Sequence, residues 1–159
     1  MAGIVTSGGT TTAATDGWYI PIDVLQGWKA KVGTWDAGVG PTNTGTVEGI
    51  GNAWLFNSTN AQNDAVTLDI YIPAGTWLVG VQAFRGANRA IFSFQLDSTE
   101  RWTYDAYNGS DVANVLVETG TYVVLTSQKY EFKMKAANRN ASATGWYLSP
   151  YGLYLRRTA

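Results

Sequence analysis

Carboxylates are the side chains that could carry catalysis in this sequence, because histidine and cysteine are both absent. Histidine is the commonest general base and cysteine is a ready nucleophile. A triad would therefore need an unusual Ser–Lys pair, for which we find no motif. Asp97, Glu100 and Asp105 are the candidates for a glycosidase carboxylate pair. Acids beside turns more often bond to the backbone, so the sequence predicts a protein that is not an enzyme.

Oxygen-bearing side chains around one predicted turn suggest a second kind of site. Asp105, Asn108 and Asp111 surround an Asn-Gly dipeptide and could ligate Ca²⁺ through oxygen atoms. Their spacing matches no EF-hand loop, and Asn-Gly by itself is typical of a hairpin turn. Thiolate ligands are impossible without cysteine. We therefore expect no metal site and no cofactor.

Aromatic side chains near predicted loops are the third candidate set. Seven Trp and nine Tyr are present, and an aromatic face can stack on the apolar C–H patches of a sugar ring while Asn, Gln and Asp bind its hydroxyls. The alternative is that these rings belong to the core or to a protein interface. The candidates for glycan or partner contact are Trp35, Trp54, Trp102, Tyr104 and Tyr107.

The composition narrows the range of partners. Eleven basic and twelve acidic residues give a net charge of −1, which disfavours a nucleic-acid binder. Charged residues make up only 14% of the chain, below the ~25% of ordinary globular proteins. Sparse charge with many aromatic residues suits a protein that packs against neighbours in an assembly, although aromatic residues are also common in strands.

Targeting signals are not recognisable in the sequence. No window approaches the ~18 consecutive apolar residues of a membrane-spanning helix. The first six residues, MAGIVT, lack the basic and apolar regions of a signal peptide. We therefore expect a soluble protein without membrane contact, made in a cytoplasm.

The hydrophobic pattern predicts many short strands. Val66, Leu68, Ile70 and Ile72 alternate with polar or aromatic residues, which is the period of a half-buried strand. A long loop is expected over residues 36–52, a turn at residues 119–120, and a bulge or bend near Pro150 and Gly152. The expected strands cover residues 18–22, 28–32, 54–56, 66–72, 76–84, 90–96, 101–107, 112–118, 122–125, 129–135 and 146–157.

These elements predict one all-β domain. Regularly spaced short strands separated by turn residues are typical of a sandwich or barrel, and an antiparallel β-sandwich of jelly-roll type with about eight to ten strands fits best. The domain is expected over residues 17–159, preceded by an extended N-terminal arm over residues 1–16. Residues 24–28 could form one helical turn at most.

Several motifs resemble small phage virion jelly-roll proteins. Residues 69–77 (DIYIPAGTW) look like the opening of that pattern, and FQLD at 94–97 followed by DAYN at 105–108 is similar to its middle. Residues 135–147 (KAANRNASATGWY), closing on LYLRR at 153–157, look like its end. Such domains occur in capsid decoration proteins, fibre heads and receptor-binding tips, usually as trimers.

The resemblance implies a virion structural protein. We expect a capsid decoration, or cement, protein that binds the major capsid or other virion proteins at the particle surface as a homo-oligomer, with a trimer as the expected state. The alternative is a receptor- or carbohydrate-binding head of a phage fibre, which would bind host surface glycans. The same sandwich form occurs in carbohydrate-binding modules, so glycan binding stays open.

Overall fold

The computed structural model describes residues 17–21, 29–39 and 53–157. The predicted arm over residues 1–16 and the possible helical turn at residues 24–28 lie outside these ranges. The described residues are all-β, and none of them forms a helix that is long and apolar enough to cross a membrane. The predicted fold class, an antiparallel β-sandwich of jelly-roll type, is confirmed.

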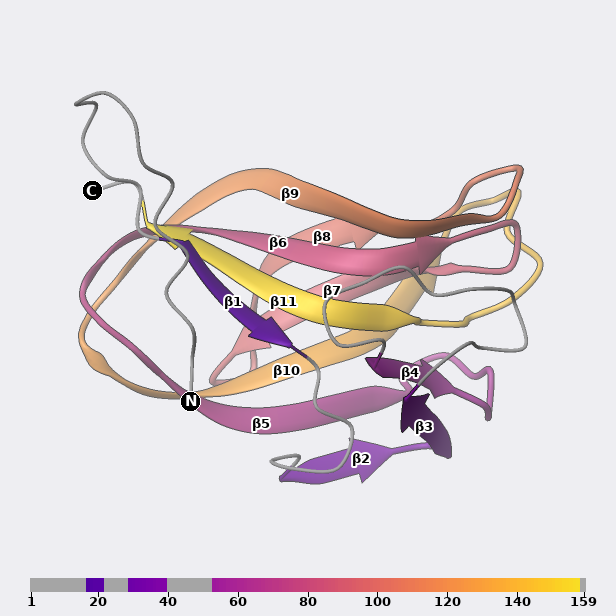
Figure 1. Cartoon of the computed structure of the whole chain (residues 1–159). Helices are drawn as coiled ribbons and strands as arrows, with labels where there is room; N and C mark the ends of the chain where they lie inside the picture. The colour runs from indigo at the N-terminus through magenta and orange to yellow at the C-terminus, as the bar shows by residue number, and fades with distance from the viewer. Residues whose placement is uncertain (1–16, 22–28, 40–52, 158–159) are drawn as a thin grey trace.

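Two antiparallel sheets form the sandwich (Figure 1). The four-stranded sheet has the order β1-β11-β6-β9, and the five-stranded sheet has the order β2-β5-β10-β7-β8. A separate two-stranded sheet consists of β3 and β4. The strands are β1 (Gly17–Pro21), β2 (Ala30–Val32), β3 (Trp35–Val39), β4 (Ala53–Asn57), β5 (Ala65–Ile72), β6 (Gly75–Arg85), β7 (Ala90–Leu96), β8 (Thr99–Asp105), β9 (Val112–Leu125), β10 (Gln128–Arg139) and β11 (Pro150–Arg157).

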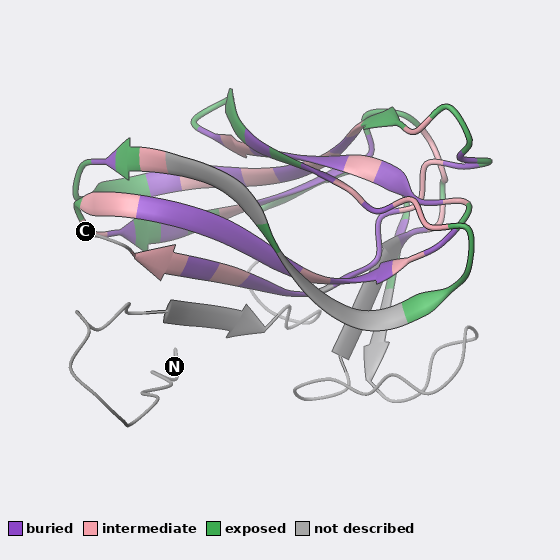
Figure 2. Cartoon of the chain, turned by 90° about the horizontal axis from the view of Figure 1, so that it is seen from above, coloured by how far each residue is buried: buried purple, intermediate pink, exposed green. Residues whose placement is uncertain are grey.

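The core lies between the two sheets, where alternate residues of each strand meet. On β10, Tyr130, Phe132 and Met134 are buried, while Glu131 and Lys133 between them face outward. Phe94 of β7 packs on Phe132 at a ring-centroid distance of 6.0 Å and stacks on Phe92 at 5.7 Å. The buried residues therefore form a continuous layer inside the sandwich (Figure 2), as the period of two requires.

The two ends of the sandwich differ in their connections (Figure 1). At one end, which we call the turn end, residues 73–74, 97–98 and 126–127 each join two strands with a two-residue turn. At the other, which we call the loop end, the connections are residues 58–64, 86–89, 106–111 and 140–149. Loops carried by a rigid scaffold are the usual place for binding, so the loop end is the first place to examine for a site.

The nine strands of the two sandwich sheets agree with the eight to ten predicted, but two details of the predicted strands are wrong. β3 occupies the first part of the loop predicted for residues 36–52. β3 forms because it pairs with β4, a partner that local composition does not reveal. The last strand begins at Pro150 and not at residue 146, but the predicted irregularity at Pro150 and Gly152 is confirmed by a register shift there.

The turn predicted at residues 119–120 is also wrong, because β9 continues through it. Leu78 of β6 pairs with Tyr122 of β9, whereas Gly80 pairs with Glu118. One residue of β6, Val79, is therefore opposite residues 119–121 of β9, so the Thr-Gly sequence is accommodated as a bulge and not as a chain reversal.

Candidate functional site

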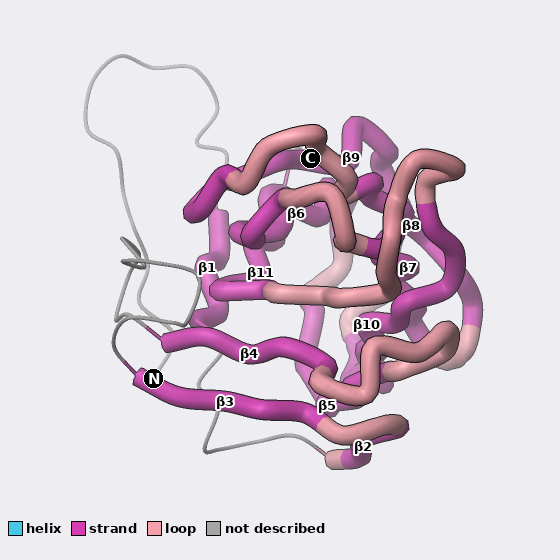
Figure 3. The backbone as a smooth tube through the Cα atoms, turned by 90° about the vertical axis from the view of Figure 1, so that its right-hand side faces the viewer, coloured by secondary structure: helices cyan, strands magenta, loops and turns pink. Residues whose placement is uncertain are grey.

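The loop end gathers connections from both sheets at one side of the molecule. Figure 3 views the molecule from this side and shows the loops after β4, β6, β8 and β10 lying next to one another. The β6–β7 and β10–β11 loops are joined by backbone hydrogen bonds, with Thr144 N donating to Ala87 O at 2.9 Å and Tyr147 N to Asn88 O at 3.2 Å. Asn108 N donates to Gly86 O at 3.2 Å, which adds the β8–β9 loop to the same network.

Gly145 allows the closest of these approaches. A Cβ atom at this position would lie 2.9 Å from Asn88 O and 3.0 Å from Asn60 Oδ1. The first distance is shorter than Cβ contacts in proteins and the second is tighter than most of them, so a larger residue would require the loops to shift. The loop end is therefore a closely packed surface whose side chains project from fixed backbone, which lowers the ordering cost of binding a ligand.

Asn57, the last residue of β4, ties the β4–β5 loop to the β10–β11 loop. Its side chain is fully buried, donates to Asp64 Oδ2 at 2.7 Å and to Trp146 O at 3.0 Å, and accepts from Leu148 N at 2.6 Å. Asn60 Oδ1 accepts from Trp146 N at 2.6 Å. These bonds fix the backbone on both sides of Trp146.

Aromatic side chains at the loop end lie against arginines. Arg139 lies over the half-buried Trp146, with 5.2 Å between its guanidinium carbon and the ring centroid. Arg89 is buried between Phe84 at 4.5 Å and Tyr147 at 5.4 Å. Contacts of this kind hold the rings in defined orientations, and Trp146 and Tyr147 keep part of their surface exposed.

Amide and carboxyl groups lie beside these rings. Asp105 Oδ2 accepts from Asn140 Nδ2 at 2.8 Å, and Asp105 Oδ1 accepts from Tyr107 N at 2.9 Å. Tyr107 is half-buried at the start of the same loop, and its carbonyl accepts from Arg85 Nη2 at 3.0 Å. Half-exposed aromatic faces beside amide and carboxylate groups are the combination that recognises sugars.

Two buried polar atoms lie beneath this surface. In the described part of the chain, Arg85 Nε and the Tyr104 hydroxyl have no hydrogen-bond partner. Burial raises the pKa of Tyr104, an effect that nearby Arg85 opposes and Asp105 reinforces. Tyr104 therefore stays a neutral phenol across the physiological pH range.

The aromatic candidates named from the sequence lie in different parts of the structure. Trp102 is 2% exposed, and Tyr104 and Trp35 are each 8% exposed, so their rings pack in the core and present no face to a ligand. Trp54 lies in β4, and its side chain is outside the described residues. Tyr107 is the member of the set that the structure places at the loop end with part of its surface exposed.

Trp146 and Tyr147 are the loop-end aromatics that sequence reasoning assigned to a strand. Both lie in the β10–β11 loop, because β11 begins only at Pro150. The polar run that precedes them, residues 138–145, was the available indication that the chain was still in a loop.

The candidate carboxylate pair is not brought together. Asp97 is in the turn before β8 and Asp105 ends that strand, so they lie at opposite ends of the sandwich. Asp97 Oδ1 accepts from Glu131 N at 2.9 Å, and Glu100 Oε2 accepts from the Ser93 hydroxyl at 2.5 Å. Each acid thus has a structural partner, and the described residues contain no cluster of three or more acidic side chains that could hold a metal ion.

Comparisons with known proteins find solved structures that resemble this chain in fold. The sequence matches no protein-family model and no curated protein. A xanthan lyase from Paenibacillus matches with a TM-score of 0.69 at 19% identity over 88% of this chain, which corresponds to 13% of the lyase chain. The CBM36-1 domain of a multidomain xylanase, from the hindgut metagenome of Trinervitermes trinervoides, matches with a TM-score of 0.55 at 14% identity, covering 91% of this chain and 98% of that domain.

A third matching structure contains a bound sugar. The carbohydrate-binding module CBM6cm-2 of Cellvibrio mixtus lichenase 5A, solved in complex with cellotriose, has a TM-score of 0.54 at 13% identity and covers 89% of this chain and 97% of the module. This chain shares its fold with carbohydrate-binding modules. At these identities the likeness concerns the jelly-roll fold, and the residues of the loop end must be judged on their own geometry.

Proposed function

We propose that this chain is a carbohydrate-binding module and that its loop end binds a glycan. The observation that carries the proposal is the position of Tyr107, Trp146 and Tyr147, which are half-exposed at one end of the sandwich beside Asn88, Asn140 and Asp105. Stacking and hydrogen bonding to hydroxyls are the two interactions that sugar recognition needs. The similarity in fold to carbohydrate-binding modules, one of them solved with cellotriose, supports the same proposal.

This proposal favours the carbohydrate-binding alternative over capsid decoration. The virion role follows from the sequence resemblance, whereas the three solved structures compared above are two carbohydrate-binding modules and a xanthan lyase. A fibre head that binds host glycans is compatible with both. The virion location, the capsid partner and the trimer stay predictions.

Binding without catalysis belongs to the same proposal. Asp97, Glu100 and Asp105 are each engaged by a hydrogen bond and are not gathered at one place. A glycosidase needs two carboxylates on either side of one bond. Release of reducing ends from a bound polysaccharide, lost in the Asp105→Asn variant, would contradict this part of the proposal.

Affinity electrophoresis against soluble polysaccharides tests the binding. We expect the protein to be retarded by at least one of xylan, mixed-linkage glucan, mannan and xanthan. Tyr107→Ala and Trp146→Ala should each weaken the binding about tenfold, which corresponds to about 1.4 kcal/mol. Tyr71→Ala is the matched control, because Tyr71 is 61% exposed on β5 and lies toward the turn end. If the Tyr71 variant is no longer retarded while the Tyr107 and Trp146 variants still are, the loop end is excluded as the site.

A further inference from the structure

The lysines of this protein are confined to one sheet. Basic residues elsewhere are arginines, whereas each lysine lies on β2 or β10 of the five-stranded sheet or directly before it. The five lysines are Lys29, Lys31, Lys129, Lys133 and Lys135. Arginine carries the same charge as lysine, so what sets this sheet apart is the row of three lysines along β10.

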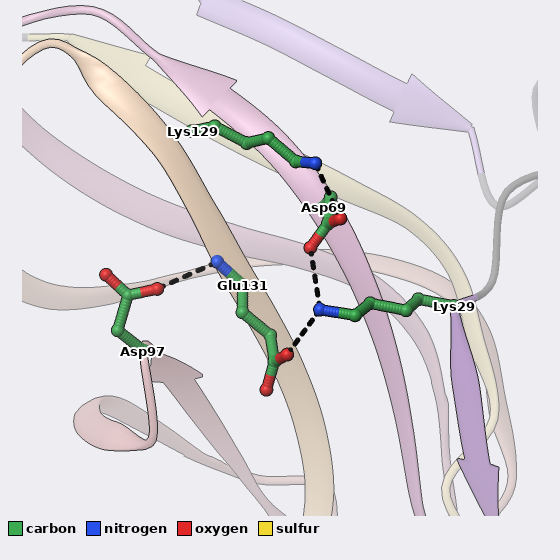
Figure 4. A network of polar contacts seen from close by, with 5 residues as sticks. All are labelled: Lys29, Asp69, Asp97, Lys129 and Glu131. Carbon is green, nitrogen blue, oxygen red and sulfur yellow. Dashed lines mark hydrogen bonds and ion pairs between the residues drawn. The ribbon is translucent and has the colours of Figure 1, made fainter.

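Near the turn end, the charges of this face neutralise one another (Figure 4). Lys29 Nζ lies 2.7 Å from Glu131 Oε2 and 3.4 Å from Asp69 Oδ1, and Lys129 Nζ lies 2.8 Å from Asp69 Oδ2. Two lysines and two acids thus form a closed network, which leaves no net charge for a partner.

Lys133 and Lys135 continue the same row without such partners. Within the described residues neither makes an ion pair, and both project from β10 on the outer face. Residues two apart on one side of a strand are separated by about 7 Å. The row therefore presents two adjacent cations toward the loop end of the face, beyond the neutral network.

The direct cross-strand neighbours of these two lysines are uncharged, and the nearest acid on the β8 side is Glu100, which pairs with Gln95 and accepts from the Ser93 hydroxyl. Lys133 lies between Thr67 of β5 and Gln95 of β7, and Lys135 lies beside Ser93 of β7. Thr103 of β8 is the next residue across the sheet from Ser93. Thr67 and Ser93 are buried although they lie on the outer face, as expected where lysine stems extend over small side chains.

We propose that this face, centred on Lys133 and Lys135, binds an acidic polysaccharide, which rests on the proposed function as a carbohydrate-binding module. The ammonium groups pair with carboxylates of uronic acid units, while Gln95 and Thr103 bond to sugar hydroxyls. A polysaccharide chain with alternating carboxylate and hydroxyl groups is complementary to this face, where lysines alternate with hydroxyl and amide groups. A nucleic acid, with one phosphate per residue, needs a larger basic excess than a protein of net charge −1 supplies.

Isothermal titration with polygalacturonate tests this inference on the full chain. Lys133→Gln combined with Lys135→Gln should weaken binding at least tenfold and abolish most of its dependence on salt between 50 mM and 500 mM. Lys133→Arg combined with Lys135→Arg should restore binding, because charge is retained. Lys31→Gln is the matched control, since Lys31 is exposed on β2, at the edge of the same sheet. Circular dichroism of each variant confirms that the fold is intact.

The outcomes separate this inference from the proposed function. If fully methyl-esterified pectin binds as tightly as polygalacturonate, or if the two-lysine Gln variant binds normally, the acidic-glycan inference fails. Should a neutral glycan still bind through Tyr107 in that case, the proposed function stands. If no glycan binds at all, both fail. A single-stranded oligonucleotide that binds the two lysines more tightly than polygalacturonate would overturn the inference in favour of a nucleic acid.

Discussion

Asn57 is the residue on which the loop end depends most. Its buried amide joins Asp64, the carbonyl of Trp146 and the amide of Leu148, so one side chain connects the β4–β5 loop to the β10–β11 loop. Buried polar networks rigidify a structure when every member is satisfied, and they are costly when one member is removed.

Asn57→Ala should lower the free energy of unfolding by about 3 kcal/mol, because two backbone groups lose their partner and the buried Asp64 carboxylate keeps only the bond from the Ala61 amide. Urea denaturation followed by tryptophan fluorescence measures the change. Asn138→Ala is the control, since Asn138 is exposed and its side chain accepts from the amide of the next residue. Equal effects of the two substitutions would contradict the role assigned to Asn57.

The neutral network of the five-stranded sheet predicts a pH dependence at the acid end. The hydrogen bond from Lys129, supported by Lys29, lowers the pKa of Asp69 below its ordinary 3.8 despite partial desolvation. A lowered carboxyl pKa stabilises the fold above pH 3.8, and this contribution disappears as the pH falls through the folded-state value. The difference in thermal midpoint between wild type and Asp69→Asn should be constant from pH 5 to 9 and shrink as the pH falls below 3.8.

Lys29 gives the corresponding effect in the alkaline range. Hydrogen bonds to Glu131 and then to Asp69 raise the pKa of Lys29 above its ordinary 10.5. Its contribution is complete below pH 10.5 and is lost as the pH rises through the folded-state value. Because these groups are solvent-exposed, 0.5 M NaCl should reduce both effects. A salt-independent difference would contradict the ion-pair explanation.

Residue types at the candidate site were predictable, but their exposure was not. Trp102 and Tyr107 both lie near the Asn-Gly turn in the sequence and looked equivalent as stacking rings. Trp102 faces the opposite sheet and is buried, whereas Tyr107 lies beyond the end of β8 and is half-exposed. Which face of a strand is covered depends on the second sheet, and sequence alone does not place that sheet.

At the scale of elements, the turn between β7 and β8 shows how the turn end is held. Asp97 and Ser98 both have positive φ, at 49° and 66°, as both central residues do in the type I′ turns favoured by two-residue hairpins. Asp97 also accepts from the amide of Glu131 on β10. The turn is thus bonded to the neighbouring strand as well as to its own hairpin.

Ser98→Gly should stabilise the protein by about 0.5 kcal/mol. Glycine removes the cost of a side chain in the left-handed region, and the greater freedom of glycine in the unfolded chain offsets part of this gain. The midpoint of urea denaturation measures the change. Ser142→Gly, in the exposed β10–β11 loop, is the control and should not stabilise. Destabilisation by Ser98→Gly would contradict this account of the turn.

Element types were predictable wherever the period of two was long, as on β5 and β10. Prediction failed where pairing decided the outcome. β3 is a strand because β4 provides its partner, and the Thr-Gly sequence in β9 is a bulge because β6 continues opposite it. Local composition describes the preferences of a segment but carries no information about its partner.

At the scale of the whole molecule, the two ends of the sandwich differ in the length of their connections and in the hydrogen bonds between them. Three two-residue turns close one end, while four loops joined by cross-bonds form the other. The proposed glycan site lies at the loop end, and the proposed acidic-glycan face lies on the five-stranded sheet. Two surfaces on one rigid body can engage one polysaccharide chain together, which would increase its avidity.

Self-association is the prediction from sequence that concerns the whole molecule. The sparse charge and the resemblance to trimeric virion domains lead us to expect a homo-oligomer. Analytical ultracentrifugation at 1 µM to 50 µM measures the mass of the species in solution. A trimer should have three times the 17.2 kDa mass of one chain. A single species of 17.2 kDa over this range would contradict the oligomer and leave glycan binding unaffected.

The bulge in β9 has a consequence for aggregation. β9 is at the edge of the four-stranded sheet, and among the described residues its only strand partner is β6. A long, regular edge strand offers its unpaired backbone groups to other molecules and can seed fibrils. The extra residues between Glu118 and Tyr122 interrupt that regularity at mid-strand, so a second copy cannot continue the ladder along the full length of β9. Deleting Thr119 and Gly120 would straighten the edge and is expected to convert a dispersed protein into one that forms thioflavin-positive fibrils on storage.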